Sequence, residues 1–260
     1  MIQEDMLITG QRSLADQIFE LKLRGKLAAN VSEPGQFVHI RVNGQSGSVA
    51  PILRRPISIC SRDRAKEEIT LIFRSGGLGT DLLKEAEPGE RLDVLGPLGH
   101  GFPVRDIHDM KKAVVIGGGV GVPPLYGLSA ELVKKGVSVL SILGFRSAKD
   151  VFYKKEFEEL GETVIMTEDG TSGIRGRVTD VLDGMDFDVA YACGPLPMLK
   201  AVQRKVSDRP LYISMEQRMG CGIGACLACV VHTTDQNDSK GYRRVCSDGP
   251  VFRAGEVELC

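Results

Sequence analysis

The sequence predicts a β-barrel, then an α/β domain, then a small cysteine-rich module. Up to about residue 100, short segments of alternating hydrophobicity recur at even spacing, as in an antiparallel barrel. After Pro103, short apolar strands alternate with helices, which favours a parallel sheet covered on both faces. From Glu216 the helical periodicity stops and a group of cysteines begins. We therefore expect three domains, at residues 1–105, 106–215 and 216–260.

The barrel half is expected to hold five strands. Ile18–Leu23 and Phe37–Val42 alternate between apolar and polar residues, which is the period of a strand. Turn-forming residues separate the strands at Glu33-Pro34-Gly35, Asn43-Gly44 and Glu87-Pro88-Gly89. The expected strands are 18–23, 37–42, 53–59, 69–73 and 91–95.

The second half is expected to alternate strands with helices. The strand Ala113–Ile116 leads into a glycine run and then an apolar helix that reaches about Lys135. A Gly-Pro turn at residue 194 opens another helix, which runs through Leu199 and Val202. The further expected strands are 137–143, 164–167, 189–193 and 211–215.

Composition disfavours several classes of protein. The net charge of the 260 residues is −1, so the chain has no basic field that would attract nucleic acid. The N-terminus lacks the basic and apolar regions of a signal peptide, and no stretch reaches the ~18–20 apolar residues that span a bilayer. Free thiols point to a reducing compartment, so we expect a cytoplasmic protein that binds neither nucleic acid nor membrane.

Four cysteines near the C-terminus predict a 2Fe-2S cluster. Cys221, Cys226 and Cys229 have the spacing C-x4-C-x2-C, and Cys246 follows, which is the ligand pattern of plant-type clusters. Zinc is an alternative, although structural zinc sites usually use two C-x2-4-C pairs. The odd total of seven cysteines disfavours a disulfide framework. Because a cluster passes one electron at a time, the motif indicates an electron-transfer protein.

The glycine run after the first strand of the second half predicts a phosphate site. Gly118, Gly119, Val120 and Gly121 stand between strand and helix, where glycines allow close approach and the helix presents free N–H groups. The run is not a G-x-G-x-x-G fingerprint, and no acidic residue closes the next strand as that motif expects. A glycine-rich turn without a ligand is the alternative.

Two further strand ends are expected at the same edge of the sheet, where ligands of open α/β sheets bind. Cys193, Gly194 and Pro195 end one strand and open a helix over the same crevice. Glu168 and Asp169 end another strand, and their carboxylates are candidates for hydrogen bonds with a ribose or an amide. For each carboxylate taken alone, an ordinary acidic turn is an equally good interpretation.

The barrel half carries a second group of candidate phosphate ligands. Arg55 belongs to the segment Arg54–Ser58, and arginine binds phosphate bidentately, while Ser58 is placed to donate to a ring nitrogen. Gly76–Thr80 opens a short helix and is a second candidate phosphate cradle. Solvated surface arginines are the alternative. A flavin followed by a nicotinamide dinucleotide would explain two phosphate sites in successive domains ahead of a cluster.

Together these motifs resemble those of the ferredoxin–NADP reductase superfamily. The order R-P-I-S, G-G-x-G-x-x-P and C-G-P-x-x-M is similar to that superfamily, and Met215–Cys226 is similar to electron-transfer subunits of dihydroorotate dehydrogenase B. The resemblance implies that FAD is held by Arg55, Pro56, Ile57 and Ser58, with Ser58 near flavin N5, and by Ile72, Phe73, Arg74, Gly79 and Thr80. It implies that the nicotinamide nucleotide is framed by Gly118–Val122 and Cys193–Pro195, and that the cluster ligands are Cys221, Cys226, Cys229 and Cys246.

The resemblance also implies an activity shared with a partner. A catalytic subunit containing FMN would oxidise dihydroorotate to orotate in pyrimidine biosynthesis, and electrons would pass through the cluster and FAD to NAD⁺. Two copies of each subunit would form a heterotetramer, and this chain would supply no catalytic acid or base. One rival is a related subunit of a bifurcating NADH-dependent ferredoxin–NADP oxidoreductase or a soluble hydrogenase. The other is a redox-sensing or zinc-stabilised binding module without turnover.

The remaining cysteines and histidines suggest no further site. Cys60 is expected to be a small buried residue, and Cys260 has no assigned role. Arg146 follows the second strand of the sheet, where an arginine could favour a 2′-phosphate, so the choice between NAD and NADP stays open. No metal set is formed by His39, His100, His108 and His232.

Overall fold

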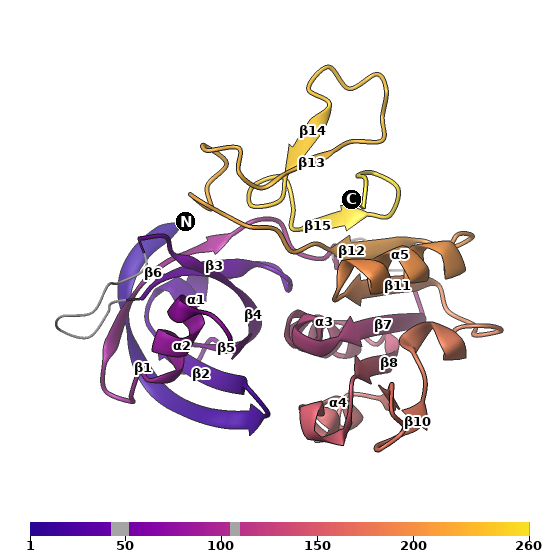
Figure 1. The fold of residues 1–260 in the computed structure, drawn as a ribbon, viewed down its shortest axis with the longest axis horizontal. Helices are drawn as coiled ribbons and strands as arrows, with labels where there is room; N and C mark the ends of the chain where they lie inside the picture. Colours follow the sequence, from indigo (N-terminus) through magenta and orange to yellow (C-terminus); the bar gives the residue numbers. More distant parts are fainter. Residues whose placement is uncertain (43–51, 105–109, 260) are drawn as a thin grey trace.

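The computed structural model describes residues 1–42, 52–104 and 110–259. Within them the chain forms a barrel, an α/β domain beside it, and a cysteine-rich module that lies across one end of both (Figure 1). The fold class expected from the sequence is confirmed. Asn43-Gly44, His108 and Cys260 lie outside the described residues.

The barrel closes through six antiparallel strands in the order β1-β2-β5-β4-β3-β6. Alternate side chains fill its interior, so Val38 and Ile40 of β3 share a core with Ile57 of β4. The strands are β1 Ile2–Ala15, β2 Ile18–Arg24, β3 Phe37–Arg41, β4 Arg55–Asp63, β5 Glu68–Arg74 and β6 Arg91–Leu98. Two short helices accompany them, α1 Leu27–Asn30 and α2 Leu78–Lys84.

The hydrophobic pattern of the sequence does not predict strand β1. Only Met6 and Ile8 are buried along it, so its alternation is too short to stand out among polar residues. Pairing with β2 on one side and β6 on the other holds this strand in place. Its conformation therefore comes from closing the barrel rather than from its own propensity.

The α/β domain is a seven-stranded sheet in the order β10-β9-β8-β7-β11-β12-β15. Every neighbouring pair is parallel except β12 with β15. The strands are β7 Lys112–Gly118, β8 Ser138–Phe145, β9 Glu162–Thr167, β10 Ile174–Arg175, β11 Val189–Cys193, β12 Leu211–Ser214 and β15 Val251–Arg253. The chain winds outward from β7 in one direction and from β11 in the other, so the order reverses between these two central strands.

Helices cover both faces of this sheet, as expected. On one face α3 (Val122–Lys134) and α4 (Lys154–Glu158) pack against side chains such as Val115. On the other face α5 (Leu196–Lys205) packs against the alternate side chains, such as Ile116. No helix within the described ranges is long and apolar enough to cross a membrane.

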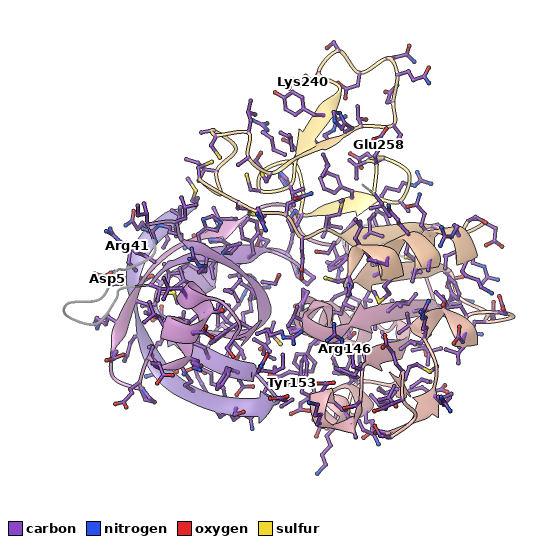
Figure 2. All side chains as sticks on the ribbon, in the orientation of Figure 1. Asp5, Arg41, Arg146, Tyr153, Lys240 and Glu258 are labelled. Atoms are coloured by element: carbon purple, nitrogen blue, oxygen red, sulfur yellow. The ribbon has the colours of Figure 1, made fainter. Side chains whose placement is uncertain are left out.

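Helix α3 also joins the α/β domain to the barrel, because it packs against β4. A Cβ atom on Gly127 of α3 would lie 2.7 Å from the carbonyl oxygen of Cys60 on β4, so the close approach depends on this glycine. Nearby, the Tyr153 hydroxyl donates a hydrogen bond of 2.7 Å to Glu20 of β2. Figure 2 shows Tyr153 at this junction.

The cysteine-rich module is built onto the sheet of the α/β domain. It contains the hairpin of β13 (Val230–His232) and β14 (Tyr242–Arg244), and its last strand, β15, pairs with β12. Phe252 of β15 is buried in the same core as helix α5. The module and the sheet therefore share one buried core. The boundary between the α/β domain and the module at residue 216 stays a prediction.

Candidate functional site

The two glycine-rich turns predicted to hold a dinucleotide meet where the strand order reverses. A Cβ atom on Gly121 would lie 2.2 Å from the carbonyl oxygen of Cys193, and one on Gly118 would lie 2.6 Å from the sulfur of Met198. The turns after β7 and β11 can therefore interlock only because these residues are glycines. Gly119 differs, since it has a φ of +52° and nothing lies within 4 Å of its Cβ position. Its backbone is open to the crevice.

The turn after β11 presents a neutral surface. Gly194 is buried and Pro195 is exposed at the start of α5. Burial, and then the neighbouring Glu216, raises the pKa of the Cys193 thiol, which therefore stays protonated at neutral pH. Glu216 follows β12 and is not among the site residues predicted from the sequence. Its side chain reaches solvent, but the surrounding protein removes enough solvation to raise its pKa.

The acidic pair at the end of β9 lies at the same edge of the sheet, beyond β8. Glu168 and Asp169 are both exposed. Asp169 Oδ1 accepts hydrogen bonds from the Thr171 hydroxyl at 2.6 Å and the Thr171 N–H at 3.0 Å. These bonds lower the pKa of Asp169. The Asp169 carboxylate is thus engaged in hydrogen bonds within its own turn, whereas the exposed Glu168 carboxylate is accessible to a ligand.

Four residues of the predicted FAD site lie at one end of the barrel: Arg55, Arg74, Gly79 and Thr80. A Cβ atom on Gly79 would lie 2.1 Å from Arg55 Nε, so the guanidinium rests directly on the backbone of α2. A pocket of about 480 Å³ adjoins it, with Arg74 and Thr80 among its lining residues. Arg74 and the glycine-rich turn therefore face one pocket, whereas Arg55 lies outside its lining, against Gly79, and its guanidinium donates to the carbonyl oxygen of Leu53.

The other residues of the predicted FAD site have different surroundings from one another. The side chains of Ile57 and Phe73 belong to the barrel core, whereas Ile72 faces the core shared with the α/β domain. Pro56 and Ser58 alternate with Ile57 and so lie on the outer face of β4. Arg54 is excluded as a phosphate ligand in this arrangement, because its guanidinium pairs with Asp93 at 2.6 Å.

Backbone N–H groups join the four module cysteines in two pairs. The N–H of Cys221 donates to Cys226 Sγ at 3.4 Å, and the N–H of Cys226 donates to Cys221 Sγ at 3.4 Å. In the second pair, the N–H of Cys246 donates to Cys229 Sγ at 3.4 Å. The first pair is near the surface and the second is buried.

The same backbone prepares Cys221 of the outer pair for ionisation. Burial opposes a charge on Cys221, but N–H groups of the loop, including those of Ile223 and Ala225, donate to its Sγ and lower its pKa to about 7. In the inner pair, burial and then the neighbouring Cys229 raise the pKa of Cys246 to about 12. A thiol in the second environment ionises when a metal binds it.

The arrangement of sulfurs fits a dinuclear centre. Among the described residues, three or more His, Cys, Asp or Glu side chains nowhere converge as a mononuclear metal site requires. Two pairs of thiolates are what a cluster with two irons uses. The module therefore offers an outer and an inner pair of sulfurs, as a 2Fe-2S cluster requires.

Apolar side chains surround the outer pair of cysteines. Ile223 and Leu227 are each 48% exposed and Val230 is 39% exposed. Leu227 is held in the left-handed region with a φ of +58°. A loop that exposes three large apolar residues beside a candidate cluster resembles a contact surface more than a solvated turn.

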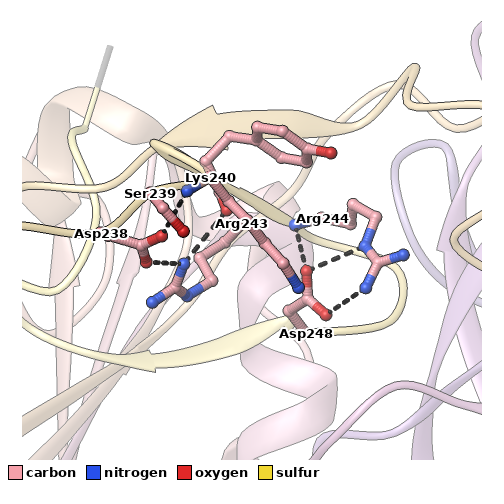
Figure 3. A pocket seen from close by; sticks show the side chains of 7 residues that line it. Asp238, Ser239, Lys240, Arg243, Arg244 and Asp248 are labelled. Carbon is pink, nitrogen blue, oxygen red and sulfur yellow. Dashed lines mark hydrogen bonds and ion pairs between the residues drawn. The ribbon is translucent and has the colours of Figure 1, made fainter.

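A polar pocket on the β13–β14 hairpin contains none of the predicted residues. Its volume is about 360 Å³. Ion pairs occupy it (Figure 3): Arg243 binds Asp238, and Arg244 binds Asp248 at 2.9 Å. Arg244 also donates to the carbonyl oxygen of Gly224 at 3.2 Å. These contacts brace the cysteine loop, so we assign the pocket a structural role.

Two known domain families match parts of the chain. Residues 216–258 match the iron-sulfur cluster binding domain of dihydroorotate dehydrogenase B. Residues 115–204 match the oxidoreductase NAD-binding domain. The first range contains the four paired cysteines, and the second contains the interlocking glycine turns.

The whole chain is similar to curated proteins. It is 52% identical over 261 residues to proteins of Bacillus cereus and Bacillus anthracis, each named dihydroorotate dehydrogenase B (NAD(+)), electron transfer subunit. The alignments cover 100% of this chain and 100% of each relative.

Solved structures share the fold. One, described as giving insights into flavin-based electron bifurcation via the NADH-dependent reduced ferredoxin-NADP oxidoreductase structure, matches with a TM-score of 0.85 and 27% identity, over 98% of this chain and 90% of that one. A cytochrome P450 reductase of Amycolatopsis matches with a TM-score of 0.62 and 27% identity, over 78% of this chain and 66% of that one. The ferredoxin reductase in carbazole 1,9a-dioxygenase, at 22% identity and a TM-score of 0.65 over 78% of this chain and 64% of that one, supports the fold alone.

Proposed function

Because this chain belongs to the family of dihydroorotate dehydrogenase B (NAD(+)) electron transfer subunits, we propose that it carries electrons between a partner that oxidises dihydroorotate and NAD⁺. The observation that carries this proposal is the pairing of four cysteine sulfurs in a loop that adjoins both the barrel and the α/β domain. The family names and the two domain matches support NAD and an iron–sulfur cluster, and the flavin reductase fold supports FAD.

We assign the residues to three sites. FAD would be held by Arg55, Pro56, Ile57, Ser58, Ile72, Phe73, Arg74, Gly79 and Thr80. The nicotinamide nucleotide would be held by Gly118, Gly119, Val120, Gly121, Glu168, Asp169, Cys193, Gly194 and Pro195. The cluster would be held by Cys221, Cys226, Cys229 and Cys246. Ile57 and Phe73 would contribute mainly backbone, since their side chains fill the barrel core.

The residues of this chain would position the cofactors rather than perform acid–base chemistry. When bound, FAD exchanges a hydride with a nicotinamide and single electrons with a cluster. Ser58 lies on the outer face of β4, where its hydroxyl is available to a ring nitrogen. Cys193 stays neutral and adds no charge to the nicotinamide crevice. This chain would therefore position the cofactors, and the partner would oxidise dihydroorotate.

The relatives favour this function over a bifurcating oxidoreductase. Identity with the electron transfer subunits is 52%, against 27% with the NADH-dependent reduced ferredoxin-NADP oxidoreductase structure. Both comparisons span nearly the whole chain, so a difference in coverage does not explain the difference in identity.

The partner we propose is an FMN-containing catalytic subunit, with two copies of each chain in a heterotetramer. The relatives' name, electron transfer subunit, supports the existence of a partner. The exposed side chains of Ile223, Leu227 and Val230 would form its docking surface beside the outer cysteine pair. We place the complex in the cytoplasm, where reduced thiols persist.

Cofactor analysis and one cysteine variant test the proposal. Protein purified without oxygen should contain FAD, iron and acid-labile sulfide, with two irons per chain if the cluster is 2Fe-2S. Cys226→Ser removes an exposed ligand, so it should retain FAD and NADH-to-dye activity but lose dihydroorotate-dependent NAD⁺ reduction with the partner. Cys60→Ala is the matched control, since Cys60 is buried at the domain junction.

The outcomes separate the parts of the proposal. Bound zinc without flavin colour would overturn it in favour of a binding module. If Cys226→Ser protein keeps full dihydroorotate-dependent NAD⁺ reduction with the partner, the cluster is not on the electron path. The proposed flavin reductase would stand in that case.

A further inference from the structure

His39 is a buried polar residue that the proposed function does not use. It lies on β3, and its side chain is 0% exposed. Val38 and Ile40 on either side of it point into the barrel core, so His39 points outward. Its cross-strand neighbour is Pro56, within the segment assigned to the flavin. His39 therefore lies on β3, directly beside the proposed flavin strand β4.

The imidazole ring lies directly against the cysteine loop of the module. A Cβ atom on Gly222 would be 2.7 Å from His39 Nδ1 and 3.0 Å from His39 Nε2. Gly222 has a φ of +72°, and it follows Cys221 in the chain. The ring thus occupies the space that a side chain at position 222 would fill. This contact joins β3, the strand paired with the flavin strand β4, to the proposed cluster loop across a long separation in sequence.

Neither ring nitrogen has a hydrogen-bond partner among the described residues. A buried polar atom without a partner is destabilising, and native proteins pair nearly all such atoms. An imidazole ring carries at least one N–H donor whether it is neutral or protonated. A ligand at the Cys221 side of the ring would satisfy this donor.

We propose that His39 is a positioning residue whose ring N–H donates a hydrogen bond to a sulfur atom at the Cys221 side of the cluster, which seats the cluster loop against β3 beside the flavin strand β4. The inference rests on the proposed cluster. Hydrogen bonds to the sulfurs of an iron–sulfur cluster change its reduction potential. A donor stabilises the more negative, reduced state, so loss of this bond should make the cluster harder to reduce.

Substitutions at His39 test the proposal on the purified chain. His39→Phe keeps an aromatic ring and removes the N–H, whereas His39→Gln keeps an N–H donor. The reduced cluster is examined by pulsed EPR in protein grown with ¹⁵N-histidine, and its potential is measured by redox titration. His232→Phe is the matched control, because His232 is an exposed histidine on β13 of the same module.

The expected wild-type result is a ¹⁵N coupling to the cluster. His39→Phe should lose that coupling and shift the cluster potential to a more negative value, His39→Gln should recover part of the shift, and His232→Phe should change neither. Absence of ¹⁵N coupling in iron-loaded wild type, or an unchanged cluster potential in both His39 variants, would overturn the inference. A shift confined to the flavin potential would place the contact on FAD and also overturn it. Failure of the proposed cluster itself would appear separately, as wild-type protein without iron and sulfide.

Discussion

Gly121 and Gly127 show how a missing side chain can define a junction. Gly121 lets the turn after β7 touch the turn after β11, and Gly127 lets α3 approach β4. In both cases the nearest atom is a backbone carbonyl oxygen, which cannot rotate out of the way as a flexible side chain can. Substitution at these positions must therefore move a main chain.

We expect Gly121→Ala to weaken NAD⁺ binding without affecting FAD. The new methyl group would lie 2.2 Å from the carbonyl oxygen of Cys193 and would separate the two turns. Overpacking of this kind costs about 1–3 kcal/mol, which corresponds to roughly a 5- to 150-fold rise in the Kd for NAD⁺. Calorimetric titration of the flavin-loaded protein measures this. Gly10→Ala is the control, since its methyl would meet only Lys22 at 3.9 Å; equal Kd values for both variants would contradict the expectation.

Glu20 and Tyr153 form a buried polar contact between barrel and α/β domain. Burial opposes ionisation of Glu20, but hydrogen bonds from Arg12 and Tyr153 outweigh it and lower its pKa below the ordinary value of 4.5. A carboxylate with a lowered pKa stabilises the fold above its unfolded-state pKa, and this contribution is lost as pH falls through the folded-state pKa.

Tyr153→Phe should therefore lower the free energy of unfolding by an amount that depends on pH. At pH 7 we expect a loss of about 1.5–3 kcal/mol, the usual range for a hydrogen bond to a charged group. The difference from wild type should shrink as pH falls below 4.5, where Glu20 becomes protonated. Urea unfolding at several pH values measures it. Tyr126→Phe, in a ring 5.2 Å from that of Tyr153, serves as control; a loss that stays constant with pH would show that Glu20 is not the partner that matters.

Strand β15 is the element that joins the module to the rest of the molecule. It pairs antiparallel with β12, and the ring of Phe252 lies beneath Gly249, whose Cβ would be 2.4 Å from it. Phe252 shares a buried core with Cys229 and Cys246. The inner cysteine pair is therefore supported by a strand of the sheet, which explains how a small module without a large core of its own can be ordered.

Phe252→Ala should destabilise the sheet edge and the cysteine site together. Truncating a buried phenylalanine typically costs about 3–5 kcal/mol. We expect a lower midpoint in urea unfolding and faster loss of iron on incubation with a chelator. Arg253→Ala, on the exposed side of the same strand, should change neither. Iron retention at the wild-type level in a destabilised Phe252→Ala protein would show that the module holds its metal independently of β15.

At the scale of the molecule, the three proposed sites follow one another in space. The barrel and the α/β domain lie side by side, and the module spans one end of both (Figure 1). The flavin strand β4 contacts α3 of the nucleotide domain, and His39 on the neighbouring strand β3 contacts the cysteine loop. The outer cysteine pair is the end of this series that reaches the surface.

A charge on the proposed docking surface should uncouple the partner. Leu227 is 48% exposed next to Cys226, and burying a glutamate there on association leaves an unpaired charge. We expect Leu227→Glu to reduce affinity for the catalytic subunit by about thirtyfold, corresponding to about 2 kcal/mol, with NADH-to-dye activity unchanged. Ile174→Glu is the control, since Ile174 is 50% exposed on β10 at the far edge of the sheet. Equal effects of both variants would remove the cysteine loop from the interface.

Much of the fold follows from local patterns. All the strands expected in the α/β half are present, because continuous apolar runs between turn signals identify buried strands without reference to their neighbours. Strands β1 and β15 escape this reasoning. Strand β1 buries only Met6 and Ile8, and β15 is only three residues long, so each becomes a strand by pairing with a partner distant in sequence.

The candidate site divides in the same way. The spacing of Cys221, Cys226 and Cys229 and the glycine runs can be read directly, since each motif lies within a few residues of chain. The sequence does not show which arginine of the pair Arg54 and Arg55 forms an ion pair, because the partner of Arg54 is Asp93, which is distant in the chain.

The amino-acid order alone therefore specifies the types of ligand this protein can hold: thiols at cluster spacing, glycines at a strand end and an arginine motif in a barrel. It does not specify that the imidazole of His39 meets Gly222, that the hydroxyl of Tyr153 meets Glu20, or that β15 completes the sheet. Those contacts join residues far apart in the chain. They exist because burial of the shared cores brings those segments together, and a local pattern contains no information about which distant residue will be its neighbour.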